Sequence, residues 1–272
     1  MPLTAAPRSS THALVTGATG GIGCAVCIEL ATQARDRATM LHLTVASSRR
    51  APRLEELLVV LRDLGASVSP AVGDLTDPAQ CRSIVNEAIS AHGDLDALIC
   101  VAGSSAAAKL ADLSVEQWDH GFALNTRPVF VMAQAARASL ARTRGSITAV
   151  ASMSGLEPHP GLGAYSAAKA ALLMLCRQLA QEWGDQGIRT NCVSPGMIRT
   201  PLTEAIYASA DVTLRREALV PLGRIGRAED IASAIAFLAG DTASYINGAN
   251  LVVDGGVSDH MLAMIPGRPG AR

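Results

Sequence analysis

Three polar side chains between residues 145 and 183 have the types and the spacing for proton transfer at a carbonyl or carbinol oxygen. Tyr165 and Lys169 are four residues apart in an alanine-rich run of helical spacing, which would place both on one helix face. A nearby ammonium favours the phenolate, so we expect Lys169 to lower the pKa of Tyr165 toward the neutral range. Ser152 could hydrogen-bond the same oxygen. The alternative is a surface Tyr–Lys pair without a chemical role.

The lysine content of the chain bears on that alternative. Of the 23 basic residues, only Lys109 and Lys169 are lysines. A compact ammonium fits beside a phenol where a planar guanidinium does not, which favours a specific role for Lys169.

A strand and the helix after it would bring these side chains together. The β-branched run from Gly145 ends at Ser152, a Gly/Pro loop follows, and Tyr165 opens the next helical run. Alternating strands and helices along the chain predict a doubly wound parallel sheet with helices on both faces and ligands at the carboxyl ends of the strands. Other predicted strands are 13–16, 41–46, 67–72, 96–101, 188–193 and 250–253; predicted helices include 24–32, 54–64, 114–142, 164–183 and 228–239, with a helical flap at 200–217 and another helix that Asp77 caps ahead of Pro78.

The first strand runs into the glycine cluster Gly17 to Gly23, and a helix follows. Glycines allow the backbone to approach a pyrophosphate, and the helix start supplies free N–H groups, so the cluster predicts a dinucleotide site. After the second strand come Ser48, Arg49 and Arg50, with no acid. An acid at this position binds the ribose 2′-hydroxyl of NAD whereas arginine accommodates a 2′-phosphate, so we expect NADP(H) rather than NAD(H). The alternative is that the arginines lie in a solvated loop.

Further along, Asp74 follows the third strand and has no capping role in the sequence, so it could accept a hydrogen bond from an adenine amino group or stabilise a turn. Gly103 follows the fourth strand, where the chain can pass close to a ligand. Asn125 interrupts an apolar run and is either a satisfied core amide or a site residue.

Composition sets the class of protein. The chain has 272 residues, 49% hydrophobic, with a net charge of -1, which fits one large domain and gives no reason to expect nucleic acid or membrane partners. We expect a cytoplasmic protein whose residues 1–10 are disordered. Cys24 and Cys27 form the one Cys-x-x-Cys, without a second pair or a histidine cluster, so we expect buried thiols and no metal.

Taken together, the motifs resemble the single-domain short-chain dehydrogenase/reductase family, and in particular ketoreductases such as the 3-oxoacyl-(acyl-carrier-protein) reductases. The resemblance covers 11–256 and implies a seven-stranded Rossmann fold with a substrate flap at about 200–224 and a tail at 257–272. The motifs are Thr-Gly-x-x-x-Gly-x-Gly at 16–23, Asp-Leu at 74–75, Ala-Gly at 102–103, Asn125, Ser152 thirteen residues before Tyr-x-x-x-Lys at 165–169, Asn-x-Val-x-Pro-Gly at 191–196 and Asp-Gly-Gly at 254–256.

The resemblance implies that Tyr165 is the acid/base, Lys169 binds the nicotinamide ribose and lowers the tyrosine pKa, Ser152 orients the substrate oxygen and Asn125 holds a water in a proton relay. The expected cofactor contacts, besides Asn125, Tyr165 and Lys169, are Gly17, Thr19, Gly20, Gly21, Ile22, Gly23, Ser48, Arg49, Asp74, Leu75, Ala102, Gly103, Pro195, Gly196, Ile198 and Thr200. One departure is Cys100-Val101, where the family has Asn-Asn and an Asn side chain braces the strands.

The sequence therefore predicts an NADP(H)-dependent oxidoreductase that interconverts a ketone or 3-oxoacyl group and a secondary alcohol. The alternatives are an NAD-dependent secondary-alcohol dehydrogenase and a non-catalytic dinucleotide-binding regulator on the same fold. Small side chains on helices 114–142 and 164–183, and a final strand followed by an apolar tail, predict a homo-oligomer, most simply a tetramer.

Overall fold

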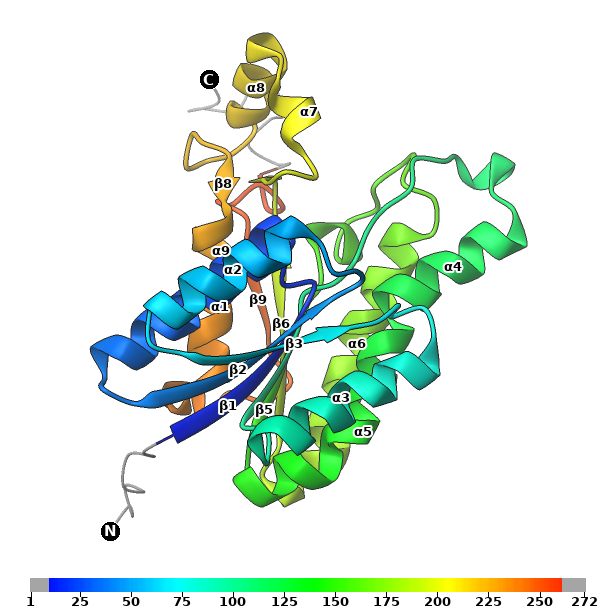
Figure 1. Ribbon diagram of the computed structural model, residues 1–272. Helices are drawn as coiled ribbons and strands as arrows, with labels where there is room; N and C mark the ends of the chain where they lie inside the picture. The colour runs from blue at the N-terminus through cyan, green and yellow to red at the C-terminus, as the bar shows by residue number, and fades with distance from the viewer. Residues whose placement is uncertain (1–9, 261–272) are drawn as a thin grey trace.

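The computed structural model describes residues 10–260 as a three-layer α/β fold in which one parallel sheet lies between two sets of helices (Figure 1). The sheet has the strand order β3-β2-β1-β4-β5-β6-β9. Its strands are β1 (Ser10–Thr16), β2 (Met40–Ser47), β3 (Ser67–Val72), β4 (Ala97–Cys100), β5 (Ser146–Val150), β6 (Arg189–Pro195) and β9 (Asn250–Val253). The predicted seven-stranded parallel sheet is confirmed.

The helices separate into two layers. One face is covered by α1 (Gly21–Asp36), α2 (Pro52–Asp63) and α9 (Ala228–Ala239), and the other by α3 (Pro78–His92), α5 (Arg127–Thr143) and α6 (Tyr165–Trp183), with α4 (Val115–Asn125) packed against α5 and α6. Two short helices, α7 (Glu204–Tyr207) and α8 (Ala210–Glu217), stand beyond the end of the sheet (Figure 1). A small pairing of β7 (Ile198–Arg199) with β8 (Gly226–Arg227) lies at their base.

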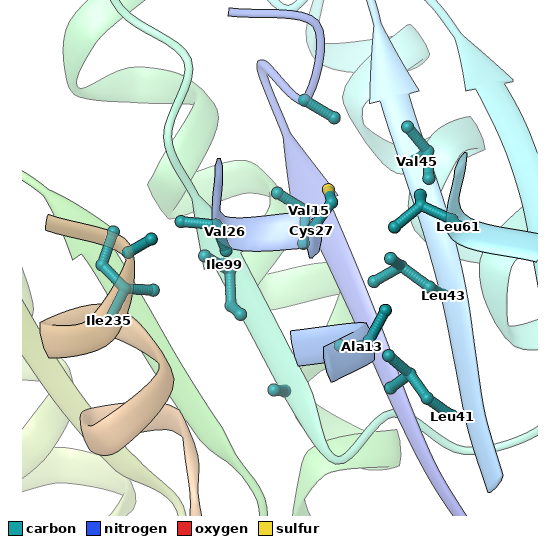
Figure 2. Packing of buried hydrophobic residues seen from close by; sticks show 14 of the residues in the cluster. Ala13, Val15, Val26, Cys27, Leu41, Leu43, Val45, Leu61, Ile99 and Ile235 are labelled. Carbon is teal, nitrogen blue, oxygen red and sulfur yellow. The ribbon is translucent and has the colours of Figure 1, made fainter. Parts of the chain in front are cut away.

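Successive residues along each strand point to opposite faces of the sheet, so the strands contribute to two hydrophobic cores, one under each layer of helices. On the α1 side, Val15, Leu43 and Ile99 from three neighbouring strands pack against Val26 of α1 and Ile235 of α9 (Figure 2). Residues of the same strands one position away, such as Leu14 and Leu98, face the α3 side. Strands buried on both faces explain the continuous apolar runs of the sequence.

The helix predicted over 114–142 is two helices, which corrects that prediction. Thr126 separates α4 from α5 with φ -128° and ψ -53°, and Pro128 stands in the first turn of α5. A proline there cannot donate to the carbonyl of residue 124 and its ring would clash with that carbonyl, so the helix breaks. The Thr126 hydroxyl then donates to the backbone oxygen of Ala168 at 2.6 Å, which joins the break to α6.

A buried amide network completes the sheet at its last strand. The Asn191 side chain donates to Ile246 O at 2.9 Å and accepts from Ala249 N at 2.9 Å. Asn247 accepts from Thr190 N at 2.8 Å and donates to Ala180 O at 2.9 Å. Neither Thr190 nor Asn191 has exposed surface. Two asparagines thus fix the segment that leads into β9.

Ser10, predicted to be disordered, pairs with Met40 as the first residue of β1, and the rest of that predicted segment, residues 1–9, lies outside the described part. Residues 261–272 of the predicted tail also lie outside it. Within residues 10–260 no helix is both long and apolar enough to cross a membrane.

Three histidines meet at the amino-terminal end of the sheet. The rings of His12 and His92 lie 5.2 Å apart between centroids, and those of His42 and His92 lie 5.0 Å apart. The two ring nitrogens of buried His12 contact Gly93 O at 3.1 Å and Thr44 Oγ1 at 3.2 Å. Because a carbonyl only accepts, Nδ1 carries a proton, and in the neutral ring Nε2 accepts from the Thr44 hydroxyl. Burial, helped by the two neighbouring histidines, lowers the pKa of His12 from 6.5 to about 4.

We therefore expect acid to destabilise the fold through His12. Its folded pKa lies below its unfolded value, so the stability that depends on neutral His12 is complete above pH 6.5 and is lost as the pH falls toward 4. The loss would reach roughly 3 kcal/mol of unfolding free energy. Chemical denaturation at several pH values measures it. His12→Asn cannot titrate and should flatten this dependence; an equally steep loss in that variant would contradict the assignment.

Candidate active site

Four strand ends bring the predicted site residues to one edge of the sheet. Thr16 of β1 is in register with Cys100 of β4, Cys100 with Ala149 of β5, and Ala149 with Cys192 of β6. The glycine turn, the 102–103 loop, Ser152 and the 195–200 segment all follow these ends. Segments far apart in the sequence thus meet at the carboxyl edge of the sheet, where doubly wound folds bind ligands.

Ser152 and Tyr165 lie together where β5 ends and α6 begins. Ser152 starts the short 3-10 turn Met153–Gly155 and its Oγ accepts from the Ser154 backbone N–H at 3.0 Å. The Ser152 hydroxyl also lies close enough to the Tyr165 phenol to lower the pKa of that phenol. Because the N–H of Ser154 occupies an acceptor position on Oγ, the hydroxyl proton of Ser152 is available to the phenol or to a substrate oxygen.

Lys169 is buried, one helical turn after Tyr165. Its Nζ donates to the carbonyl of Val150 at 2.8 Å and lies 5.7 Å from the centroid of the tyrosine ring. Burial lowers the pKa of Lys169 from 10.5 to about 8. The surface-pair explanation of the Tyr–Lys spacing is therefore wrong, since the lysine is inside the protein.

The expected effect of Lys169 on Tyr165 needs correction. Burial raises the pKa of Tyr165, and the hydrogen bond from Ser152 lowers it by less. The sequence predicts the charge neighbour but not the depth at which the phenol lies, and desolvation of the phenolate is the larger effect.

Gly103, in the loop after β4, lies between Asn125 at the end of α4 and the lysine. The Asn125 side chain donates to Ser104 O at 2.8 Å and to Gly121 O at 3.0 Å, and it accepts from Ser104 N at 3.2 Å. A Cβ on Gly103 would lie 2.8 Å from Asn125 Oδ1 and 3.0 Å from Lys169 Nζ. Asn125 is thus a satisfied core amide and a neighbour of the site at once, and Gly103 must lack a side chain.

A cavity of about 330 Å³ opens beside these residues, over the glycine turn. Gly17 has φ +63°, and a Cβ there would lie 2.8 Å from the backbone of Ala102; one on Gly23 would lie 2.2 Å from Gly17 O. The start of α1 has no side-chain cap, so its N–H groups are free for a ligand. The predicted cofactor residues that line this cavity are Gly17, Thr19, Gly20, Gly21, Ile22, Gly23, Ser48, Asp74, Leu75, Ala102, Gly103 and Thr200.

Other predicted contacts lie elsewhere. Asn125 and Tyr165 line an adjoining cavity of about 130 Å³, and a Cβ on Gly196 would lie 2.5 Å from Asp254. Ile198 is buried. Arg49, Lys169 and Pro195 are not in the lining of the larger cavity, and Arg50 pairs with Glu55 at 2.7 Å on the exposed surface.

Asp74 has the turn-stabilising role that the sequence offers as its alternative. Its Oδ1 accepts from the backbone N–H and from the hydroxyl of Thr76, both at 2.8 Å. These bonds lower the pKa of the Asp74 carboxyl. Asp74 therefore stabilises the turn, and it also lines the cavity.

Several residues of the site are missing from the sequence prediction. Ser104, Leu124 and Leu202 line the cavity, and the Thr19 hydroxyl lies 3.2 Å from that of Ser47, which donates to Arg49 O at 3.1 Å. Leu202 belongs to the predicted flap, so the flap meets the cavity. The described residues contain no group of three or more His, Cys, Asp or Glu placed to hold a metal ion, and Cys27, Cys81, Cys100, Cys176 and Cys192 are buried free thiols.

Comparison with known proteins identifies the family. Residues 17–258 match the family model described as enoyl-(acyl carrier protein) reductase. The chain is 34% identical to a 3-oxoacyl-(acyl-carrier-protein) reductase of Thermotoga maritima, over 90% of this chain and 96% of the other. It is also 34% identical to dehydrogenase/reductase SDR family member 4 of Bos taurus, over 94% and 90%. The chain belongs to the short-chain dehydrogenase/reductase family.

Solved structures agree in fold and differ in cofactor. A protein from Agrobacterium tumefaciens with bound NADP, provisionally named a 2-deoxy-D-gluconate 3-dehydrogenase, has a TM-score of 0.80 and 32% identity, over 91% of this chain and 96% of that one. A 7α-hydroxysteroid dehydrogenase in complex with NADH and 7-oxo glycochenodeoxycholic acid has a TM-score of 0.84 and 27% identity, over 92% and 95%. As a member of the family, this chain is an oxidoreductase of carbonyl and alcohol groups, and the family uses NAD(P)(H).

Proposed function

We propose that this protein uses NADP(H) to interconvert a ketone, or a 3-oxoacyl group, and a secondary alcohol, with Tyr165 as the acid/base. The observation that carries the proposal is the meeting of the Tyr165 phenol, the Ser152 hydroxyl and the buried Lys169 ammonium beside the glycine-lined cavity. A protein that only binds a dinucleotide would need neither Ser152 nor a phenol at this place.

In this mechanism the nicotinamide, when bound, supplies or accepts the hydride. Tyr165 donates a proton to the carbonyl oxygen in reduction and takes it back in oxidation. Ser152 directs its hydroxyl proton to the same oxygen, so that negative charge developing there meets a fixed donor. Lys169 holds a positive charge one turn away, which favours the phenolate that forms when the proton leaves. Asn125 holds the loop after β4 against the lysine and, in the proposed relay, orients a water.

The cofactor preference rests on the end of β2. Ser48 lines the cavity, Arg49 follows it, and no acid stands there to bind a ribose 2′-hydroxyl. The NADP-bound relative supports this choice. A specific observation favours the NAD-dependent alternative: Arg50 is paired with Glu55, and Arg49 lies outside the cavity lining. Phosphate binding would therefore rest on Ser48 and Arg49.

We also propose a homo-oligomer, most simply a tetramer with two-fold axes. Large apolar side chains are exposed in two places: Phe130 and Met174 on α5 and α6, and Leu251 and Val252 on β9. Exposed edge strands and apolar helix faces are typical subunit interfaces. Of the apolar tail residues proposed to take part, Val257 is half-buried, whereas Met261, Leu262, Met264 and Ile265 lie outside the described part of the chain.

Tyr165→Phe removes the transferable proton and keeps the ring, so turnover should fall by about two to four orders of magnitude while cofactor binding persists. A panel of ketones and 3-oxoacyl thioesters, followed by NADPH absorbance, measures turnover, and NADPH fluorescence measures binding. Near-normal turnover in the variant would refute the role of Tyr165. A wild-type protein inactive on the whole panel would count against the proposed reaction.

Arg49→Glu places a carboxylate where the 2′-phosphate is proposed to lie, so the Kd for NADPH should rise by more than about tenfold and that for NADH should change little. Parallel fluorescence titrations with both cofactors measure the difference. Arg53→Glu, with the same charge change on α2, is the matched control. Equal weakening of both cofactors by Arg49→Glu would show that the phosphate site is elsewhere.

Light scattering at micromolar concentration tests the oligomer. The expected mass is four times the 28.1 kDa of the chain. A mass near that of one chain would disprove the assembly.

A further inference from the structure

The loop between Ser152 and Tyr165 holds one histidine in a fixed position. His159 stands between Pro158 and Pro160. Pro158 fixes its own φ, and Pro160 confines His159 to extended conformations. The loop is also tied to Ala108, which donates to Gly161 O at 3.0 Å and accepts from Gly163 N at 2.9 Å. The backbone of His159 is therefore restrained from both sides.

His159 forms hydrogen bonds with residues that lie next to or near the two candidate catalytic residues, Ser152 and Tyr165. Its backbone N–H donates to Ser166 Oγ at 3.1 Å, and Ser166 directly follows Tyr165. Its ring Nδ1 lies 3.1 Å from Ser154 Oγ, and Ser154 is buried two residues after Ser152. One residue thus links the start of α6 to the turn that follows β5.

Ser154 in turn orients Ser152. The backbone N–H of Ser154 donates to Ser152 Oγ, so the direction of that N–H decides which way the Ser152 proton can point. The turn has little room to move, because a Cβ on Gly155 would lie 2.9 Å from the backbone of Lys169. A hydroxyl held by the His159 ring is therefore coupled to the geometry at Ser152.

We propose that His159 is a positioning residue, which holds the Ser154 hydroxyl, fixes the Ser154 N–H and so keeps the Ser152 hydroxyl directed at Tyr165. The proposal rests on the function proposed above for Ser152 and Tyr165. It does not require His159 to touch the substrate. Its consequence is specific: without the bond to Ser154, the Ser152 hydroxyl is less well held on the phenol, and the pKa of Tyr165 rises further because the bond that opposes the effect of burial weakens.

Replacing His159 by asparagine or by glutamine distinguishes the positioning role from a contact with the substrate. An asparagine amide reaches the place of Nδ1 and can replace the bond to Ser154, whereas a glutamine amide reaches the place of Nε2 and leaves Ser154 unpaired. We expect His159→Ala, His159→Gln and Ser154→Ala to lower kcat about tenfold with little change in KM. His159→Asn should retain most of the activity. Glu157→Ala is the control, since the Glu157 side chain has no hydrogen bond or ion pair within residues 10–260.

A direct titration needs neither substrate nor cofactor. Tyrosinate absorbance of each variant, minus that of the same variant carrying Tyr165→Phe, isolates Tyr165 from Tyr207 and Tyr245. In His159→Ala and Ser154→Ala, Tyr165 should titrate about half to one pH unit higher than in the wild type. In His159→Asn, Tyr165 should titrate at the same pH as in the wild type. The pH profile of kcat should shift in His159→Ala and Ser154→Ala, in the same direction as the Tyr165 titration, and should stay unchanged in His159→Asn.

The outcomes are distinct. An unchanged titration of Tyr165 in both His159→Ala and Ser154→Ala would overturn the proposal. So would a rise in KM for one substrate alone with Asn no better than Ala, because that would mark a substrate contact. Should His159→Ala fail to fold, Ser154→Ala and His159→Asn carry the same test. A wild-type protein without activity would contradict the proposed function, while the titration of Tyr165 would still test the role of His159.

Discussion

The buried ammonium of Lys169 is the constraint on which the candidate site depends. A charge removed from water is costly unless it is bonded, and here the carbonyl of Val150 at the end of β5 accepts from it. The surrounding chain has to leave room for the side chain, which is why Gly103 has no Cβ beside Nζ and why Gly155 lies against the backbone of the same residue. The hydrogen bond and the packing of the Lys169 side chain therefore join strand β5, helix α6 and the loop after β4.

On the cofactor side of the site, close packing between backbone segments likewise requires a glycine. Gly17 lies against Ala102, and the Thr16 hydroxyl accepts from the N–H groups of Val101 and Ala102 at 3.2 Å and 3.3 Å. Thr16 thereby braces the ends of β1 and β4 where an asparagine side chain is absent. The departure at Cys100-Val101 leaves this edge of the sheet bonded, and Cys100 is one of the buried apolar side chains under α5 and α6.

The sequence predicts local structure where one element decides it. The bounds of β3, α9 and β9 agree with the prediction because apolar patterning, a helix start and a glycine turn lie within a few residues of each other. Two misses are local: the break at Thr126 follows from Pro128 two residues later, and the pair that removes Arg50 from the cofactor site joins residues five apart. The raised pKa of Tyr165 is different, because it depends on burial by segments far away in the sequence. The Pro-His-Pro run at 158–160 is visible in the sequence, but its bond to Ser154 is not.

The asparagine network at the last strand has a consequence for how the chain is made. Thr190 and Asn191 are buried in β6, yet their partners, Ile246, Asn247 and Ala249, lie 55 to 58 residues further along the chain and are therefore synthesised later. Until then, β6 is an open edge with polar groups that lack their final partners. The seven-stranded sheet therefore cannot be completed before residues 246–253 are made, and the step that completes it is the docking of strand β9 onto β6.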